Sequence, residues 1–262
     1  MFQPVLPFSG VSGWRFLQST YDRQYESFTK SADLKRDTEY FQKNIASIET
    51  AEDLVNDRRL LTVALGAFGL QDDLNNRYFI QKILEEGTTN DDSLANRFAD
   101  PRYADLSRAF GLGPGEVRKT SDAGFAGDII AQFQANRFEI AAGDQDQTMR
   151  IALYAQRELE NLASEETSID TKWFAIMGDP PMRSLFEKAL SLPSAFGQID
   201  IDQQLGVFKA RASRVFGSAD PSVFSDEAKR DELITRFVAM DQIDQLSASL
   251  SSGAIALSLL QR

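Results

Sequence analysis

Apolar residues recur every three or four positions along almost the whole chain, and this spacing most constrains the fold. Side chains spaced in this way lie on one side of an α-helix, because the helix repeats every 3.6 residues or so. Runs of alternating β-branched residues, which would indicate strands, are missing. The chain is therefore predicted to be an all-α, multi-helix protein.

Two kinds of dipeptide are predicted to mark where the helices end and begin. Phe-Gly is expected to end a helix, because glycine readily adopts the left-handed conformation beyond the last turn, and its phenylalanine is expected in the core. Asp-Pro is expected to begin a helix. The carboxylate can cap the free backbone N–H groups of the first turn, and proline fits the first helical position because its missing N–H group costs nothing there. The pairs are Phe68-Gly69, Phe110-Gly111, Phe216-Gly217, Asp100-Pro101, Asp179-Pro180 and Asp220-Pro221.

Landmark residues occur in the same order in the two halves of the chain, which predicts an internal duplication. Residues 1–143 would form an N-terminal helical half and residues 144–262 its C-terminal repeat, packed as one compact unit. The alternative is that any two amphipathic helical halves can be aligned in this way. A glycine-rich stretch at 111–124 has no counterpart and is expected to be a surface insertion. The matched pairs include Tyr40 with Tyr154, Asp57 with Asp179, Leu70 with Leu192, and Phe133 with Phe237.

The composition excludes most common catalytic chemistry. The 262 residues include no Cys and no His, so disulfides, thiol nucleophiles, imidazole bases, zinc sites and triads that need His are excluded. A formal charge of −11 disfavours a nucleic-acid partner. Neither 111–115 nor 144–155 has the spacing of a phosphate loop or a calcium loop, so no cofactor or metal is predicted. The chain is not expected to be an enzyme, and one that uses only carboxylates, Lys or Tyr is the least favoured hypothesis.

The chain shows no targeting segment. Its first residues have no basic region and no long apolar run, and no later stretch of about 18 apolar residues occurs. We expect a protein that is made in the cytoplasm and does not span a membrane. Export to the flagellum by a route without oxidative folding stays open, because the lack of Cys fits both locations.

The two ends of the chain carry apolar stripes that form the predicted partner-binding or self-associating element. Helical spacing places each set of side chains on one side of a helix, and the C-terminal stripe runs through a serine-rich segment that is too apolar to be left in water. The alternative is that both stripes pack onto the body of the same molecule. The residues assigned to this element are Trp14, Leu17, Tyr21, Tyr25, Ile243, Leu246, Leu250, Leu257 and Leu260.

The stretch 51–112 resembles domain-of-unknown-function family 1217, which occurs mostly in alphaproteobacteria. The resemblance depends on an ordered series of short motifs, and it is weaker in the second half of the chain. The segment 87–92 departs from the family because it lacks the Asp-Pro commonly found before the serine. The motifs are Asp57-Arg58-Arg59-Leu60-Leu61, Ala67-Phe68-Gly69-Leu70, Ser93-Leu94-Ala95-Asn96-Arg97-Phe98 and Asp100-Pro101-Arg102-Tyr103.

The resemblance implies a helical protein without an assigned activity or established catalytic residues. Members of the family tend to be encoded near flagellar genes, which implies a connection with motility. The first hypothesis is therefore a non-enzymatic protein associated with flagellar structure or assembly, whose partner is a flagellar component or a second copy of the chain. The alternative is an intracellular binding or regulatory module that captures a partner helix in an α-helical groove.

Overall fold

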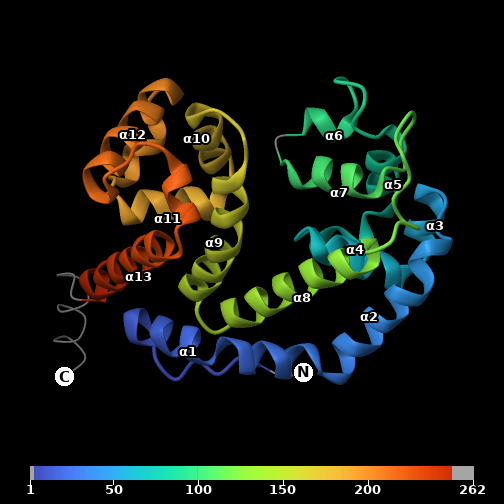
Figure 1. Ribbon diagram of the computed structural model, residues 1–262, viewed down its shortest axis with the longest axis horizontal. Helices are drawn as coiled ribbons and strands as arrows, with labels where there is room; N and C mark the ends of the chain where they lie inside the picture. Colours follow the sequence, from blue (N-terminus) through green and yellow to red (C-terminus); the bar gives the residue numbers. More distant parts are fainter. Residues whose placement is uncertain (1–2, 99, 250–262) are drawn as a thin grey trace, which may run out of the picture. The chain divides into compact units, whose positions relative to one another are not determined.

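A computed structural model describes residues 3–98 and 100–249 of the chain. These residues form thirteen α-helices and four short 3-10 helices, with no strand among them (Figure 1). The prediction of an all-α protein is confirmed. Within the same residues, no helix is long and apolar enough to cross a membrane.

The chain divides into two compact units. Unit 1 comprises Asp22–Ala141 and the start of the chain, and unit 2 comprises Val5–Tyr21 and the described part of Ala142–Arg262. Helix α1 (Gly10–Thr29) contributes residues to both. Unit 1 also contains α2 (Ala32–Asn44), η1 (Ile45–Ser47), α3 (Ala51–Asn56), α4 (Arg58–Ala67), η2 (Gln71–Asn75), α5 (Arg77–Glu86), α6 (Leu94–Arg97), α7 (Arg102–Phe110) and most of α8 (Phe125–Gly143). Unit 2 contains α9 (Gln147–Ser164), α10 (Ile169–Gly178), α11 (Pro180–Ala189), η3 (Ser194–Gln198), α12 (Ile201–Phe216), η4 (Pro221–Ser225) and α13 (Glu227–Ser249).

The ends of α4 in unit 1 follow from its sequence. The Asp57 carboxylate caps the first turn by accepting hydrogen bonds from the backbone N–H groups of Arg59 and Leu60, at 3.0 and 3.1 Å. The last turn ends with the backbone N–H of Leu70 donating to the carbonyl of Leu65 at 2.8 Å. Gly69 makes this closure possible, because its φ of +69° is a conformation that side-chain-bearing residues rarely adopt.

Helix α11 in unit 2 has the same kind of ends. The Asp179 carboxylate accepts from the N–H of Met182 at 2.9 Å, and Pro180 takes the first helical position, as predicted. The last turn closes with the N–H of Leu192 on the carbonyl of Glu187 at 2.8 Å. Here Ser191 adopts the left-handed conformation, with φ of 54°, and it is the only non-glycine residue with positive φ in the described part of the chain.

Aromatic rings dominate the core of each unit. In unit 1 the ring of Phe28 meets that of Phe138 edge to face at a centroid distance of 5.4 Å, and both side chains are buried. In unit 2 the ring of Trp173 stacks on Phe208 at 5.5 Å and meets Phe186 edge to face at 5.3 Å. Such pairs add about 0.5–1.5 kcal/mol to the stability that the buried area itself provides.

The prediction that the glycine of each Phe-Gly pair adopts a left-handed conformation is confirmed, because Gly69, Gly111 and Gly217 all have positive φ. Phe110 and Phe216 are buried, as predicted. The same expectation was wrong for Phe68, which is only half-buried. Helix α4 ends at this residue, and Leu70, which is 2% exposed, occupies the buried apolar position instead.

Two of the expected helix starts differ from the structure. Asp220-Pro221 begins the short 3-10 helix η4 instead of an α-helix. Asp100 accepts from the N–H of Arg102 at 3.1 Å, and α7 begins at Arg102, one residue later than predicted.

Periodicity did not predict α3 or α10. Helix α3 is six residues long, which is too short to show a repeat, although Thr50 and Asp53 form a capping box at its start. Helix α10 contains Trp173-Phe174-Ala175-Ile176-Met177, which is apolar on nearly every side. A helix without a polar face has no amphipathic pattern to detect.

Candidate protein-association surface

The first half of α1 lies in unit 2, against α13. Asp231 of α13 accepts a hydrogen bond from Gln18 at 2.8 Å and forms an ion pair with Arg15 at 3.2 Å. Trp14 and Leu17 are completely buried. The structure therefore places these two predicted binding residues in the core, as the alternative interpretation has it.

The other two predicted residues of α1 lie in different surroundings. Tyr21 and Tyr25 are both half-buried. Tyr21 is the last α1 residue of unit 2, whereas Tyr25 belongs to unit 1. The Tyr25 ring meets Phe138 edge to face at 5.6 Å. A role of these four residues in partner binding stays a prediction. Because Trp14 and Leu17 are buried, the exposed candidates lie at the other end of the chain.

Helix α13 is apolar on one side through its middle turns. Leu233, Ile234, Phe237 and Val238 are each at most 1% exposed. They fill the core of unit 2 where α13 packs along α9 and α11. Their spacing of three and four residues is the pattern that the sequence predicted for a helix with a single buried side.

The buried side of α13 becomes polar one turn later, at Asp241, which is only 9% exposed. Its carboxylate accepts hydrogen bonds from Thr148 at 2.5 Å and Gln245 at 2.7 Å, and it forms an ion pair with Lys188. Burial raises the pKa of Asp241, but the hydrogen bonds from Lys188 and Thr148 outweigh it and hold the pKa below the ordinary value. The apolar part of the buried side of α13 therefore ends at this carboxylate.

The apolar residues of α13 then change sides. Ile243 and Leu246 are 52% and 55% exposed. From Ile234 to Ile243 is about two and a half helical turns, so Ile243 lies on the side opposite the buried stripe. Leu246 follows three residues later on the same outward side. Leu250, Leu257 and Leu260, the remaining residues of the predicted stripe, lie outside the described residues.

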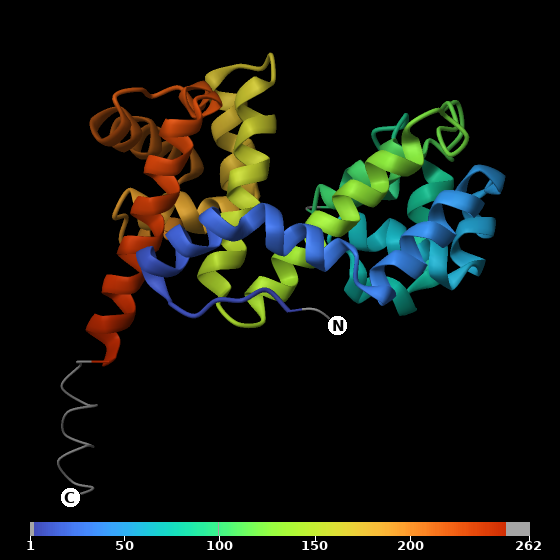
Figure 2. The same cartoon turned by 60° about the horizontal axis from the view of Figure 1, so that its bottom comes forward.

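The chain's first residues add two exposed apolar side chains to the same unit. Val5 is 54% exposed and Phe8 57%, and the Phe8 ring touches Phe16 edge to face. Gly10 lies so close to α13 that a Cβ atom on it would be 2.3 Å from Oε1 of Gln242. Both views place the start of α1 beside the second half of α13, and in Figure 2 the last turns of α13 extend beyond it.

We call Val5, Phe8, Ile243 and Leu246 the terminal surface. Helical spacing could indicate Ile243 and Leu246, but Val5 and Phe8 precede the first helix and follow no helical repeat. The one signal for them is two apolar residues in a segment that contains no charge. Large exposed apolar side chains make a unit a candidate for protein association.

Unit 1 contains an acidic hollow of about 450 Å³ between the start of α3, the end of α5 and the loop at 112–114. Glu49, Glu52 and Glu85 line it. Hydrogen bonds from Gln81 and Lys82 lower the pKa of Glu85, so this carboxylate is ionised near neutral pH. In the described part of the chain, no three acidic side chains come close enough to hold a metal ion.

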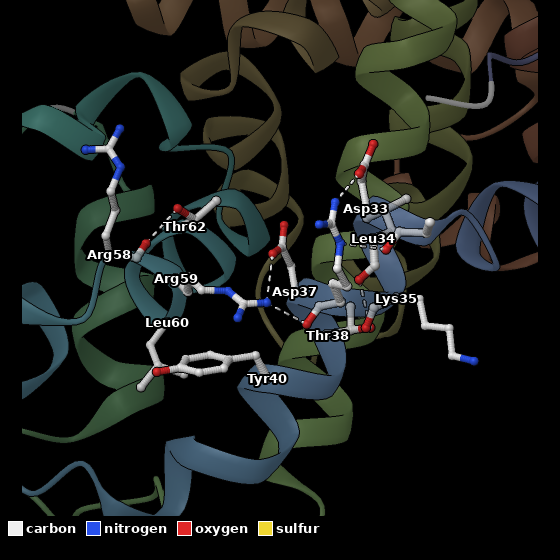
Figure 3. A network of polar contacts seen from close by, with 12 residues as sticks. Asp33, Leu34, Lys35, Asp37, Thr38, Tyr40, Arg58, Arg59, Leu60 and Thr62 are labelled. Atoms are coloured by element: carbon white, nitrogen blue, oxygen red, sulfur yellow. Dashed lines mark hydrogen bonds and ion pairs between the residues drawn. The ribbon is translucent and has the colours of Figure 1, made fainter.

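A polar network joins α2 to α4 in unit 1 (Figure 3). The Arg59 guanidinium lies 4.2 Å from the centre of the Tyr40 ring and donates to the carbonyl of Arg36 at 2.9 Å and to Asp37 at 3.4 Å. The Tyr40 hydroxyl donates to Asp57 at 2.7 Å, and this hydrogen bond raises the pKa of the tyrosine. The network thereby fastens α2 to α4.

Comparison with known proteins places this structure in a family. Residues 67–229 match the family described as "Protein of unknown function (DUF1217)", which is more than half of the chain. The chain belongs to the DUF1217 family. The matched residues include the Asp100–Tyr103 motif through which the sequence resembles this family. They do not include the terminal surface, because all four of its residues lie outside 67–229.

The fold of this DUF1217 chain is also found in a solved structure. The crystal structure of protein AGR_C_984 from Agrobacterium tumefaciens is similar with a TM-score of 0.71 and 24% sequence identity. The similar region covers 92% of this chain and 99% of the other. No curated protein matches the chain. At this level of identity the likeness establishes the fold alone.

Proposed function

We propose that this DUF1217 protein is non-enzymatic and acts in flagellar structure or assembly by binding a protein through the terminal surface. The observation that carries the proposal is the outward exposure of Ile243 and Leu246, each more than half exposed. Covering apolar surface gains about 25 cal/mol for each Å² removed from water. A protein partner is therefore the expected occupant.

The flagellar setting rests on the family resemblance, because members of this family tend to be encoded near flagellar genes. A role without catalysis agrees with a composition that has neither Cys nor His. It also agrees with the polar networks described above, whose groups are used in capping helices and joining them.

A complementation experiment in the cell of origin tests this function. The gene is deleted and replaced by the wild-type gene, by an Ile243→Glu/Leu246→Glu variant, or by an Ile201→Glu control. Ile201 is 45% exposed and also belongs to unit 2, so its substitution introduces a single carboxylate of the same kind at a comparable apolar position.

Deletion is expected to reduce swimming in soft agar, and the wild-type and control genes to restore it. The double variant is expected not to restore swimming, although its helical circular dichroism stays that of the wild type. Normal swimming of the deletion strain, or full restoration by the double variant, would contradict the proposal.

A second candidate is a module that captures a partner helix. The observation that favours it is the seating of residues 10–21 on unit 2, with Trp14 and Leu17 completely buried. The test measures binding of a labelled peptide of residues 5–21 to the full-length wild type and to the full-length Trp14→Ala/Leu17→Ala variant. In the variant the chain's own helix α1 is held less tightly, because it has lost two buried side chains. Tighter peptide binding by the variant than by the wild type is expected, and equal binding would contradict the candidate.

A further inference from the structure

We propose that residues 111–118 of unit 1 form a flap over the acidic hollow, and that the Glu116 carboxylate is the latch that holds this flap closed. The inference goes beyond the proposed function, because it concerns unit 1 and uses no residue of the terminal surface. It rests on the shape of the flap, on the contacts of its tip and on the residues that line the hollow.

The flap leaves and rejoins the rest of unit 1 at nearly the same point. The backbone N–H of Lys119 donates to the carbonyl of Phe110 at 3.1 Å, which closes the loop at its base. Gly111 has φ of +62°, and a Cβ atom on it would lie 2.1 Å from the carbonyl oxygen of Val117. A compact loop whose two ends are joined in this way can move as a unit about its base.

The tip of the flap is held by one carboxylate. Glu116 accepts hydrogen bonds from the backbone N–H and the hydroxyl of Thr88, at 2.6 and 2.8 Å, and from the N–H of Gly113 at 3.1 Å. Thr88 donates to Oε1 and Gly113 donates to Oε2, so both carboxylate oxygens are used. Beside them the Thr89 hydroxyl donates to the carbonyl of Pro114 at 3.0 Å. Glu116 therefore fastens the flap to the loop that follows α5.

The latch is charged near neutral pH. Burial raises the pKa of Glu116, but the hydrogen bonds from Thr88 and Gly113, with the nearby Lys119, outweigh it and hold the pKa below the ordinary value. Hydrogen bonds to an ionised acceptor are stronger than those to a neutral one. The charge of the carboxylate is therefore part of what keeps the flap closed.

The closed position is built into the backbone on both sides of the contact. A Cβ atom on Gly113 would lie 2.3 Å from the Cα of Gly87, so a side chain at this point of the flap would prevent closure. Gly87 has φ of +68°, a conformation that favours glycine. The sequence sets the two segments apart for different reasons, since 87–92 departs from the family's motif and 111–124 has no counterpart in the second half. The structure brings them together in one contact.

The flap has no buried apolar side chain to anchor it. Every residue from 112 to 118 is exposed or half-buried, and Val117 is 77% exposed. Segments with few buried apolar contacts and accessible hydrogen bonds open locally at a lower free energy than the whole domain unfolds. The polar latch therefore decides how often the flap opens.

The flap forms one wall of the hollow. Its residues 112–114 line the hollow together with Ala51 at the start of α3 and Glu85 near the end of α5. Ala51 is only 2% exposed while the flap is closed. Movement of the tip away from the loop after α5 would widen the hollow and expose Ala51 to solvent.

Amide hydrogen exchange of the full chain tests the latch. Glu116→Gln keeps the shape of the side chain but turns an N–H₂ group towards the N–H of Gly113, so this hydrogen bond is lost. The Gly113 and Thr88 amides should exchange about tenfold faster than in the wild type, because a charged acceptor has been replaced by a neutral one. The Leu70 amide, which closes α4, should be unaffected. Asp122→Asn is the control, since it removes an exposed carboxylate between the flap and α8. Unchanged exchange of Gly113 in Glu116→Gln, or equal acceleration in Asp122→Asn, would overturn the latch.

Thiol labelling tests whether the flap covers the hollow. The chain contains no cysteine, so Ala51→Cys provides a single reactive group. Its labelling should become about tenfold faster when Glu116→Gln is added, and should not change with Asp122→Asn. Ala64→Cys makes the same substitution at a completely buried position of α4, where labelling requires unfolding of unit 1. Equal acceleration at both positions would mean that Glu116→Gln loosens the whole unit, and no acceleration at position 51 would mean that the flap does not cover the hollow. Either result overturns the proposal.

Discussion

Two tyrosine–aspartate links, one in each unit, perform the same task in different surroundings. In unit 1 the hydroxyl of Tyr40 on α2 donates to one oxygen of Asp57, whose other oxygen caps α4. In unit 2 the hydroxyl of Tyr154 on α9 donates to Asp179 in the same way, and Asp179 caps α11. Each carboxylate therefore begins one helix and fastens it to another.

Both tyrosine side chains are half-buried, but the two links differ in what raises the pKa of the tyrosine. Burial is the main cause of the raised pKa of Tyr154, with the Asp179 carboxylate second. For Tyr40 the main cause is the hydrogen bond to Asp57, and the nearby Arg59 opposes it. One local arrangement is therefore kept while its environment changes, so equal substitutions in the two units measure the effect of that environment.

These links are also the landmarks that suggested an internal duplication. Asp57 and Leu70 are separated by the same number of residues as Asp179 and Leu192, and each pair marks the start and closure of a helix. The shared local geometry agrees with the predicted correspondence. Duplication of the whole halves stays a prediction.

The largest expected difference comes from removing the two carboxylates. Asp179→Ala should lower the free energy of unfolding by about 3 kcal/mol, since it removes a helix cap and leaves the more deeply buried tyrosine hydroxyl without an acceptor. Asp57→Ala should cost about 1 kcal/mol, close to the value of a cap alone, because water can replace the lost partner of Tyr40.

Urea unfolding can assign these losses to the units, because Trp14 and Trp173, the chain's two tryptophans, both belong to unit 2. Tryptophan fluorescence should therefore follow unit 2, whereas circular dichroism at 222 nm or so follows the helices of both units. Asp179→Ala should shift the fluorescence transition, and Asp57→Ala should shift only the dichroism. Equal losses in the two variants would contradict the difference in burial.

Much of the fold could be predicted from the sequence, because its signals are local. Gly69, Gly111 and Gly217 end helices as expected, since a left-handed residue after a helix is a property of the glycine itself. The end of α11 could not be predicted in this way, because Ser191 takes the left-handed conformation without a compositional signal. The closing interaction there is visible only in the backbone geometry.

The candidate surface was predicted in part, for a related reason. Periodicity identified the apolar residues of α1 and α13, but it does not tell which side of a helix another element covers. Trp14 and Leu17 are buried, whereas Ile243 and Leu246 are exposed, and only the packing of unit 2 separates these cases. Val5 and Phe8 follow no helical repeat, so the spacing could not indicate them.

Removal of the tyrosine hydroxyls should produce the next largest difference, and it should depend on pH. Both tyrosines have pKa values above the ordinary 10 in the folded chain. A tyrosine whose folded pKa is raised contributes stability below pH 10 or so and loses it as the pH rises further, because the unfolded chain ionises first. Tyr154→Phe should therefore flatten the fall in stability above that pH more than Tyr40→Phe does.

The stability of the wild type and of both variants is measured by urea unfolding at pH values between about 8 and about 11. Near neutral pH, Tyr154→Phe should cost about 1 kcal/mol, since Asp179 loses a hydrogen-bond donor, and Tyr40→Phe should cost less. Parallel pH profiles for the wild type and both variants would show that neither hydroxyl is coupled to folding.

Exchanging the residues that close α4 and α11 should change the stability of the two units in opposite directions, by smaller amounts. Gly69→Ser should destabilise unit 1 by about 1 kcal/mol, because a side chain is disfavoured in the left-handed conformation. A Cβ atom there would also lie 3.3 Å from the Arg102 guanidinium. Ser191→Gly should stabilise unit 2 by about 0.5 kcal/mol, since relief of strain is partly offset by the greater freedom of glycine in the unfolded chain.

The unfolding midpoints of the two variants should therefore move in opposite directions. Ser191→Ala serves as the control, because it keeps the backbone restriction and removes only the hydroxyl. If Ser191→Ala stabilises unit 2 as much as Ser191→Gly does, the left-handed conformation is not the source of the strain.

The smallest expected difference concerns the arginines beside the two tyrosines. The Arg59 guanidinium carbon lies 4.2 Å from the centre of the Tyr40 ring, whereas that of Arg157 lies 5.5 Å from the Tyr154 ring. A cation close to the face of an exposed aromatic ring contributes about 0.5–1 kcal/mol, and the contribution weakens with distance. Arg59 also donates to the carbonyl of Arg36, which a lysine reproduces less well because it lacks the planar fork. Arg59→Lys should therefore lower the stability of unit 1 by about 0.5 kcal/mol, and Arg157→Lys should change unit 2 by less. Both effects are read from urea midpoints at low and high salt, and a larger loss for Arg157→Lys would mean that distance from the ring does not decide the contribution.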